Sequence, residues 1–320
     1  MAEILKAHGS RNDIFIVPLT PADFKTDADL RVFVRALCDR GGPLGGDGAY
    51  FYDAGPDVPR AWFFNPDGSS AEFCGNGMRC LGRVVLDLRG AGRAVIQSGA
   101  VRYAVSRGPV TREGVHQVRL EHPRVDFGEL EATIPALDPA LTFSAVSVPN
   151  PHLIAFTDKY VESDLVAMGE TIARRRDLFP AGANLSVLVP VTAGEIFVRT
   201  YERGAGLTAS CGSGMVAARA VYSRTGFGRI GRADQDQSVI IHNVGGVAEV
   251  SLADWQPILQ GNATYVYRAE VDRAAVPSAI EEFDDEARAY AALERENQHW
   301  LADTCGLSGT VDALASLCTR

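Results

Sequence analysis

Hydrophobic residues recur along the chain with two periods, which predict helices and strands in mixed order. Apolar positions spaced three and four apart predict amphipathic helices over residues 27–39 and 161–176. Runs rich in β-branched and aromatic residues predict strands at 61–65 and 195–201, each followed by a glycine-containing loop. The mixture indicates an α/β (α+β) fold class.

The same order of predicted elements occurs twice along the chain. Cys74 and Cys211 are 137 positions apart, and each follows a strand and a loop and precedes Gly-x-Gly-Met and a helical pattern. Three further pairs of segments agree in order, with the first two offset by 138 and 136: 12–17 with 150–156, 45–53 with 181–189, and 94–106 with 238–252. A shared period of this length indicates a duplicated unit. We therefore expect two pseudo-symmetric lobes, each a mixed sheet wrapped around a central helix, with the active site in the cleft between them.

The breaks in the pattern suggest where the parts begin and end. We expect the N-terminal lobe over 1–130, the C-terminal lobe over 131–263, a final strand at 264–272 that returns to the first lobe, and a helical extension over 273–320. In the extension, Ser278 and Glu281 have capping-box spacing, and the apolar face that follows would carry Ile280, Phe283, Ala287 and Ala291. Such a helix would pack against the body or against a partner subunit.

Composition limits the classes of function. The 320 residues are 46% hydrophobic and 22% charged, with a net charge of −9, so a general nucleic-acid binder is disfavoured and a small charged metabolite is compatible. No apolar run approaches membrane-spanning length, and the first residues lack a secretory pattern. Six sparse cysteines without a C-x₂-C pair predict reduced thiols in a cytoplasm and no metal site.

Two of the cysteines stand where a helix is expected to begin. Unpaired N–H groups and the positive end of the helix dipole converge there, so the thiol pKa can fall toward neutrality. The same N–H groups can hold a carboxylate. They belong to Gly75, Asn76, Gly77, Gly212, Ser213 and Gly214.

These features predict a racemase or epimerase with two bases. If the lobes face each other, a bound carboxylate has one cysteine on each side of its α-carbon, and one thiolate removes the α-proton while the opposite thiol supplies another. A pyridoxal phosphate enzyme needs a Schiff-base lysine. The chain has only Lys6, Lys25 and Lys159, none in a stretch typical of a cofactor site, so we expect no cofactor.

Three other interpretations remain open at this point. A cysteine beside glycine is usually a small buried residue, which is the interpretation we give Cys38, Cys80, Cys305 and Cys318. Gly204-x-Gly206-x-x-Ala209 follows a strand and formally matches a dinucleotide fingerprint, but its preceding strand ends in polar residues. A nucleotide-binding or thiol-redox protein is therefore the rival class.

The stretches FFNPDGSSAEFCGNGMRC and RTYERGAGLTASCGSGMVAA resemble the two signature regions of the diaminopimelate epimerase family, as do NPH at 150–152 and FPAGAN at 179–184. The resemblance implies a two-lobed, cofactor-free homodimer that interconverts LL- and meso-diaminopimelate for lysine and peptidoglycan synthesis. It implies that Cys74 and Cys211 are the base and acid, with His152 and Glu202 supporting them. The residues that the resemblance assigns to the substrate are Asn12, Asn65, Gly75, Asn76, Asn150, Asn184, Glu202, Arg203, Gly212 and Ser213.

The sequence departs from the family pattern at several places. Leu207 stands where the family usually has glutamate, and Arg11 replaces a glycine. Because relatives of this fold act on other amino acids, a racemase for another amino acid such as histidine is the near alternative. For Glu202 and Arg203 a surface ion pair is the plain alternative, and for His152 it is a hydrogen-bonded core histidine.

Overall fold

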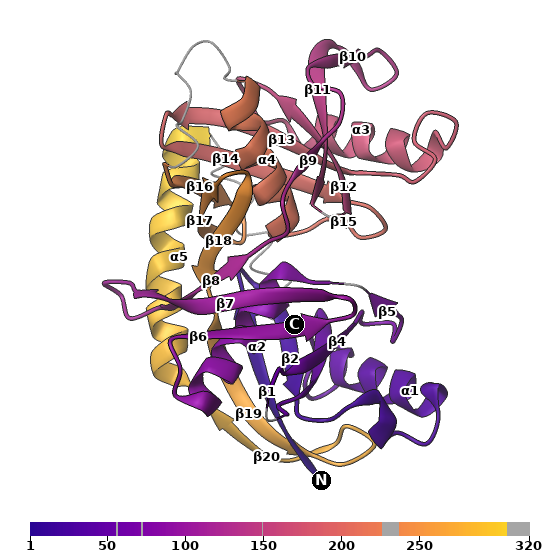
Figure 1. Ribbon diagram of the computed structural model, residues 1–320, viewed down its shortest axis with the longest axis vertical. Helices are drawn as coiled ribbons and strands as arrows, with labels where there is room; N and C mark the ends of the chain where they lie inside the picture. Colours follow the sequence, from indigo (N-terminus) through magenta and orange to yellow (C-terminus); the bar gives the residue numbers. More distant parts are fainter. Residues whose placement is uncertain (56, 72, 149, 226–236, 306–320) are drawn as a thin grey trace. The chain divides into compact units, whose positions relative to one another are not determined.

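The computed structural model describes residues 1–305 apart from 56, 72, 149 and 226–236 (Figure 1). The described chain divides into two compact units. The first unit comprises residues 1–120 and 260–296, and the second comprises 121–259 and 297–305. The contacts divide the chain at 120 and 259, close to the lobe ends at 130 and 263 that the sequence suggested.

The first unit is a mixed sheet with a helix buried against it. Its strands pair in the order β20–β19–β1–β2–β3–β4–β6–β7–β8, with β2–β3 and β4–β6 parallel and β5 beside β4. Their bounds are β1 (Ala2–Gly9), β2 (Asn12–Val17), β3 (Gly48–Asp53), β4 (Arg60–Phe64), β5 (Ser70–Ala71), β6 (Arg93–Ser98), β7 (Val101–Val110), β8 (His116–Glu121), β19 (Thr264–Val271) and β20 (Pro277–Glu282).

Two helices cover opposite parts of this sheet. Helix α1 (Asp27–Cys38) begins at the N-cap Thr26, whose hydroxyl accepts from the Asp29 N–H, and packs into an aromatic-rich core. Helix α2 (Gly75–Arg89) packs against β1 and β2 and ends at Gly90, which has φ of 58°. The short helix η1 (Pro21–Asp23) precedes α1.

The second unit repeats this plan. Its strands pair in the order β10–β11–β12–β13–β14–β16–β17, with β12–β13 and β14–β16 parallel. Their bounds are β9 (Asp126–Phe127), β10 (Ala132–Ile134), β11 (Asp138–Val148), β12 (Asn150–Phe156), β13 (Asn184–Thr192), β14 (Glu195–Glu202), β15 (Gly206–Leu207), β16 (Val239–Asn243), β17 (Gly246–Ala253) and β18 (Gln256–Asn262). Helix α3 (Glu162–Arg174) corresponds to α1, and the buried helix α4 (Gly212–Thr225) corresponds to α2.

The repeat predicted from the sequence is confirmed by the pairing. Strand β1 corresponds to β11, β2 to β12, and so on to β7 with β17, and the parallel and antiparallel pairs fall at the same places. The helices expected at 27–39 and 161–176 are α1 and α3. The two-lobed α/β fold class is therefore confirmed.

The extension differs from the helix expected throughout 273–320. Ser278 and Glu281 lie in β20, which pairs with the edge of β19, so they form no capping box. Helix α5 begins only at Asp284 and runs to Cys305. Its buried positions are Tyr290, Asn297 and Leu301, whereas Ala287 is exposed, as is Ile280 in β20, so the expected apolar face is wrong. The open edge of β19 supplied backbone partners that the helical pattern could not reveal. Cys318 lies outside the described residues.

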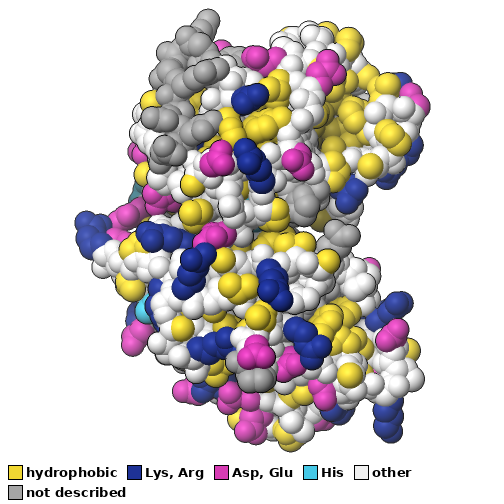
Figure 2. All heavy atoms as spheres, viewed as in Figure 1, with side chains coloured by type: hydrophobic (Ala, Val, Ile, Leu, Met, Phe, Trp, Pro, Cys, Tyr) yellow, Lys and Arg dark blue, Asp and Glu magenta, His cyan; other side chains and the backbone are white. Residues whose placement is uncertain are grey.

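On the face shown in Figure 2, basic and acidic side chains of the described residues are interspersed rather than gathered by sign. The chain carries 31 Lys and Arg against 40 Asp and Glu. Among the described helices, none has the length and apolarity needed to cross a membrane.

Candidate active site

Cys74 is the N-cap of α2, as the sequence predicted. Its backbone is extended, and its Sγ accepts a hydrogen bond from the Gly77 N–H at 3.4 Å. The Tyr50 hydroxyl lies 3.0 Å from the Cys74 N, which donates to it, and 3.3 Å from the Cys74 carbonyl, to which it donates. Burial holds the pKa of Tyr50 well above its usual value, so this hydroxyl keeps its proton and fixes the cap.

Asn12 meets the sulfur of Cys74. The Cys74 Sγ lies 3.4 Å from the Asn12 Oδ1, and Asn12 is the first residue of β2 directly after the turn from β1. The sulfur is half-buried. A thiol can donate to this carbonyl oxygen while its lone pairs face the start of the helix.

The other predicted residues of the first unit are placed differently. Gly75 and Asn76 form the first turn of α2, and Asn76 is only 4% exposed. Asn65 follows β4, where its backbone and side chain both bond Ser69, at 2.9 Å and 3.0 Å. Asn65 thus shapes the loop that leads to β5 and the cysteine.

Cys211 precedes α4 in the same way, but it is only 7% exposed. Its Sγ lies 3.6 Å from the Ser213 Oγ. Burial is the first reason that the pKa of Cys211 is raised well above its usual value, and the nearby Glu202 carboxylate adds to it. The Gly214 N–H bonds the sulfur and partly opposes the shift. Desolvation raises the pKa of Glu202 as well.

A buried histidine links the predicted polar residues of the second unit. The His152 Nε2 lies 3.0 Å from the Ser213 Oγ, 3.2 Å from the Asn150 Oδ1 and 3.4 Å from the Asn184 Nδ2. Burial lowers the pKa of His152 to about 3, so the imidazole is neutral. All three contacts are to Nε2, which in the neutral ring either donates, to the Asn150 Oδ1 or the Ser213 Oγ, or accepts, from the Ser213 hydroxyl or the Asn184 amide.

Asn184 also orders the segment after β14. Its Oδ1 accepts from the Arg203 N at 2.8 Å, and the Arg203 guanidinium donates to the Ala181 carbonyl at 2.6 Å. The Thr208 hydroxyl donates to Glu202. Among the ion pairs of the described chain, none joins Glu202 to Arg203, so their interpretation as a surface pair is wrong.

The two sulfurs have opposite electrostatic neighbours. In the first unit the Arg79 guanidinium is fully buried, and it donates to the Asn262 carbonyl at 3.3 Å and the Ser10 Oγ at 3.4 Å. Its charge interacts foremost with Cys80 and also with Cys74. The position 137 residues later is Val216, an apolar residue of α4. A cation thus lies near one sulfur and a carboxylate near the other.

Burial is the first cause of the pKa shift of each of the other described cysteines. Burial raises the pKa of Cys38 and Cys80 to about 12, and that of Cys305 to about 11. Within the described residues, no cluster of histidine, cysteine and carboxylate side chains could hold a metal ion.

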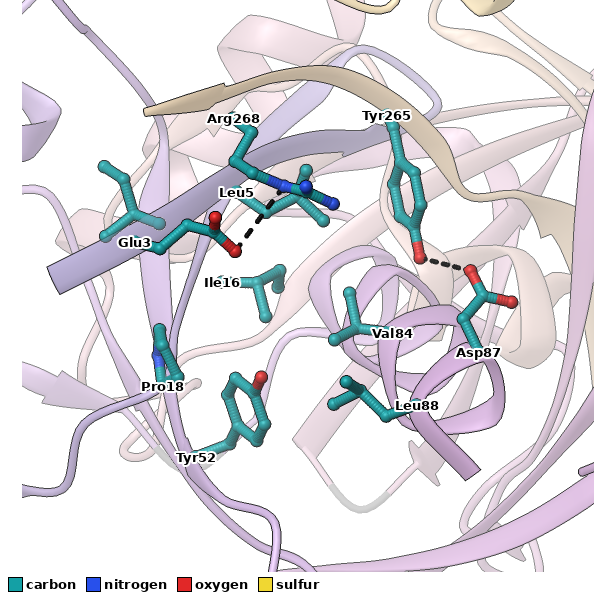
Figure 3. Close-up of a pocket in the computed structure, with 11 residues that line it drawn as sticks. Glu3, Leu5, Ile16, Pro18, Tyr52, Val84, Asp87, Leu88, Tyr265 and Arg268 are labelled. Carbon is teal, nitrogen blue, oxygen red and sulfur yellow. Dashed lines mark hydrogen bonds and ion pairs between the residues drawn. The ribbon is translucent and has the colours of Figure 1, made fainter. Parts of the chain in front are cut away.

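A separate hollow of about 300 Å³ lies in the first unit (Figure 3). It is lined by residues of β1, β2, α2 and β19, and its mouth carries the Glu3–Arg268 ion pair. None of the predicted site residues lines it, so it is not the candidate active site.

Sequence reasoning missed several residues that hold the site. Tyr50 was part of an apolar strand, and a buried hydroxyl cannot be told there from a core tyrosine. Thr208 and Arg79 lie within the quoted motifs, and only their proximity to the cysteines could have singled them out. Ser10 had no signal beyond its place in a turn.

Comparison with known proteins agrees with the two motifs. A sequence profile described as diaminopimelate epimerase matches residues 4–114 and 144–266. A diaminopimelate epimerase of Clostridium acetobutylicum is 32% identical over 314 residues, covering 90% of this chain and 92% of that protein. A diaminopimelate epimerase of Methanopyrus kandleri is 33% identical over 274 residues, covering 83% and 88%.

Solved structures share the fold at low identity. A phenazine biosynthesis protein from Bacillus anthracis superposes with a TM-score of 0.61 at 16% identity, covering 85% of this chain and 99% of that one. A hydroxyproline epimerase from Agrobacterium vitis, with bound trans-4-hydroxy-L-proline, gives 0.57 at 13% identity, covering 84% and 90%.

Proposed function

Because the chain belongs to the diaminopimelate epimerase family, we propose that it interconverts LL- and meso-diaminopimelate by moving one proton at one α-carbon. The observation that carries the proposal is the pair of cysteines at equivalent helix starts, each with its sulfur bonded by the third N–H of the helix. A helix N-terminus favours negative charge, so each sulfur can exist as thiolate during the cycle.

Cys74 and Cys211 are the proposed catalytic residues. One thiolate takes the α-proton, the electron pair left on carbon is delocalised into the carboxylate, and the other thiol delivers its proton to the opposite face. The N–H groups of Gly75 and Asn76, and of Gly212 and Ser213, are the proposed donors to that carboxylate. The third N–H of each start already serves the sulfur.

We assign the resting protons by the neighbouring charges. The carboxylate of Glu202 and deep burial favour the protonated thiol at Cys211. The Arg79 guanidinium, whose charge acts on Cys80 and Cys74, favours loss of the Cys74 proton, which is donated to the Asn12 Oδ1 until it is lost. Cys74 is therefore the proposed first base for one epimer and Cys211 the first acid, and one turnover exchanges their protonation states.

The polar residues around each sulfur are proposed to bind the substrate. Asn12 and Asn65 lie in the first unit, and Asn150, Asn184 and Arg203 in the second. An arginine can bind the distal carboxylate, and amides can both donate to it and accept from the distal ammonium. His152 is the proposed positioning residue for Ser213. No cofactor enters this mechanism.

A panel of amino acids in D₂O tests the substrate. Proton NMR should show loss of the α-proton signal of diaminopimelate and no exchange in histidine, proline or lysine. Exchange in another amino acid, with none in diaminopimelate, would assign the chain to a racemase with a different substrate and leave the two-cysteine mechanism in place.

We also propose, from the family relationship, that the enzyme is a cytoplasmic homodimer. Light scattering coupled to size exclusion should give twice the chain mass of 34.3 kDa. A mass of one chain at working concentration would contradict it. Fractionation of cells that produce the chain tests its location.

A further inference from the structure

One face of α5 carries three polar side chains at four-residue spacing, Glu286, Tyr290 and Glu294. This spacing places them one above another along the helix. Each contacts a different part of the first unit. The residues matched by the family profile end at 266, so α5 lies outside that match.

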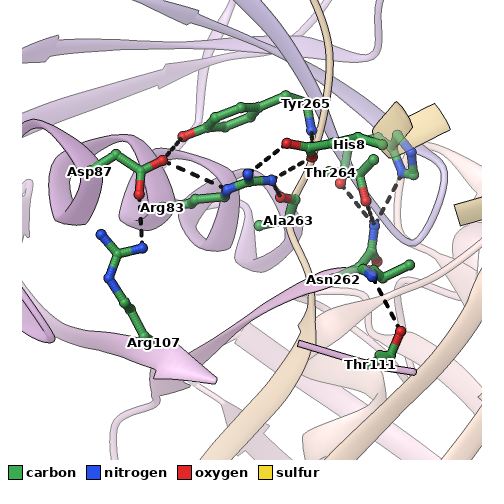
Figure 4. A network of polar contacts seen from close by, with 11 residues as sticks. His8, Arg83, Asp87, Arg107, Thr111, Asn262, Ala263, Thr264 and Tyr265 are labelled. Atoms are coloured by element: carbon green, nitrogen blue, oxygen red, sulfur yellow. Dashed lines mark hydrogen bonds and ion pairs between the residues drawn. The ribbon is translucent and has the colours of Figure 1, made fainter. Parts of the chain in front are cut away.

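The first contact holds α2. The Glu286 carboxylate accepts two hydrogen bonds from the Arg83 guanidinium, at 2.5 Å and 2.6 Å, and a third from the Tyr265 N at 2.9 Å. Figure 4 shows Arg83 between Asp87 and the backbone of Ala263, to which it donates at 2.7 Å. Since Arg83 belongs to the helix that Cys74 caps, this contact fixes α5 against the helix of the first cysteine.

The other two contacts hold the turn between β1 and β2. The Tyr290 ring meets the His8 ring edge-on, with centroids 4.3 Å apart. Glu294 forms an ion pair with Arg11, and each of these side chains is only 16% exposed. Arg11 immediately precedes Asn12, whose side chain meets the sulfur of Cys74.

This turn is in a conformation that its residues disfavour. Gly9 pairs with Asn12 across a two-residue loop, and the loop residues Ser10 and Arg11 have φ of 53° and 63°. Such a turn favours asparagine and glycine, because other L-residues adopt positive φ only at a steric cost. Contacts from outside the turn must therefore keep it in place. The Ser10 N donates to the Asn262 Oδ1 at 2.7 Å, and Figure 4 shows Asn262 beside His8 and Thr264.

The geometry points to Glu294 as a positioning residue that acts through Arg11 to keep Asn12 against the sulfur of Cys74. Helix α5 thereby fixes the position of Asn12 relative to Cys74. It holds the helix of Cys74 through Arg83, and it holds the turn before Asn12 through Arg11. This inference rests on the proposed function only in taking Cys74 as an acid/base group. The extension then does more than pack against the first unit, because it positions a side chain at the proposed acid/base group.

Three variants separate this role from simple support of the fold: Glu294→Gln, Arg11→Gly and the double variant. Glu294→Gln removes the carboxylate and leaves Arg11 without its ionic partner, so turnover should fall about tenfold as Asn12 shifts. Glycine at 11 adopts the same φ without steric cost and needs no ion pair. Adding Glu294→Gln to Arg11→Gly should therefore change the rate by less than about twofold.

The matched control is Glu296→Gln, on the same helix. Glu296 pairs with Arg112 at the surface, at 3.0 Å with side chains 57% and 84% exposed. Its removal should leave turnover unchanged. A loss in Glu294→Gln that persists in the Arg11 background would assign Glu294 to helix stability and overturn the proposal, as would wild-type turnover in Glu294→Gln.

A second readout needs no substrate. Iodoacetamide alkylation, resolved by mass spectrometry for each cysteine, should become several-fold faster at Cys74 in Glu294→Gln and stay unchanged at Cys211. Equal rates at Cys74 in both proteins would overturn the proposal. If alkylation shifts as expected but the wild-type protein exchanges no α-proton of diaminopimelate, the proposed function fails and the positioning role stands. Should Glu294→Gln not fold, Glu294→Asp, which shortens the reach to Arg11, is expected to change Cys74 alone in the same direction, and unchanged alkylation there would contradict the role.

Discussion

The two cysteine sites share one backbone frame and differ in the charges placed on it. Each sulfur stands at the start of a buried helix and is bonded by the third N–H of that helix. Positions 137 residues apart then diverge: Arg79 of the first unit is Val216 in the second, and Asn65 of the first is Glu202 in the second. The two cysteines thus occupy equivalent backbone positions, and the residues substituted around them carry different charges.

The asymmetry matters because a two-base enzyme needs unlike protonation states at one time. A coupled pair of thiols titrates in two steps even in identical surroundings, and unlike charges decide which sulfur loses its proton first. The Glu202 carboxylate adds to the burial that raises the pKa of Cys211, whereas the charged neighbour of Cys74 is the Arg79 guanidinium. The two units are therefore alike in the backbone around the sulfur and unlike in the charges near it.

Replacing either sulfur tests this division most strongly. We expect Cys74→Ser and Cys211→Ser each to lower turnover by about 10³-fold, because a serine hydroxyl is a poor base at neutral pH. Rates measured from LL- and from meso-diaminopimelate, with circular dichroism to verify folding, provide the test. If either variant inverts the substrate at a near-normal rate, that cysteine is not one of the two bases.

Glu202→Gln should change the charge near Cys211 and leave the surroundings of Cys74 unchanged. Loss of the carboxylate lowers the pKa of Cys211, so its alkylation moves to lower pH while that of Cys74 stays the same. Turnover should fall about 10- to 100-fold, since the pKa of Cys211 is no longer raised by the carboxylate in addition to burial. Glu170→Gln, an exposed carboxylate paired only with Arg174, is the control. An unchanged pH profile for Cys211 would remove Glu202 from the account.

The buried histidines should make both units sensitive to acid. Burial lowers the pKa of His152 to about 3 and that of His8 to about 4, from 6.5. Below pH 6.5 the unfolded chain binds protons that the folded chain excludes, so stability falls as the pH decreases, by up to about 1.4 kcal/mol per pH unit for each histidine. Urea unfolding midpoints at pH 7 and pH 5 should differ less in His152→Gln than in the wild type. Replacing the exposed His299 should leave the difference intact, and an equal difference in His152→Gln would contradict the assignment.

The equivalent glycines Gly77 and Gly214 compare how tightly each helix start is packed. A Cβ would lie 2.9 Å from the Tyr50 ring at Gly77 and 2.6 Å from the Thr200 Oγ1 at Gly214. We expect each alanine variant to lose about 1–3 kcal/mol, against a helix gain of about 1 kcal/mol. Gly92→Ala, which meets no atom within 4 Å, should be neutral in thermal unfolding. Unchanged melting of Gly77→Ala would show that the Tyr50 ring is free to move.

The duplicated fold could be predicted from the sequence because the same order of strands, loop and helix occurs in both halves. The spacing around Cys74 and Cys211 placed both at helix starts, and α1 and α3 followed from their apolar periods. The extension could not be predicted in the same way. Residues 277–282 have polar and apolar residues compatible with a helix, and only the open edge of β19 makes them a strand.

Long-range partners set the rest of the site. Tyr50 bonds the backbone of Cys74, the charge of Arg79 acts on its sulfur, and Glu294 pairs with Arg11 beside Asn12, so the three contacts come from three elements. Arg11 was visible only as a departure from the family pattern. The structure shows that Arg11 forms an ion pair with Glu294 of α5, 283 positions later in the chain. The sequence pattern therefore located the two cysteines, and only the tertiary contacts show which side chains surround them.

The most direct test of two separate proton carriers is the partition of deuterium at early times in D₂O. LL-diaminopimelate is converted by a few per cent, and mass spectrometry measures deuterium in the product and in the recovered substrate. With two thiols, the meso product should carry one deuterium while the recovered LL epimer keeps its protium. Deuterium that appears in recovered substrate as fast as in product would show a single exchanging base and contradict the account.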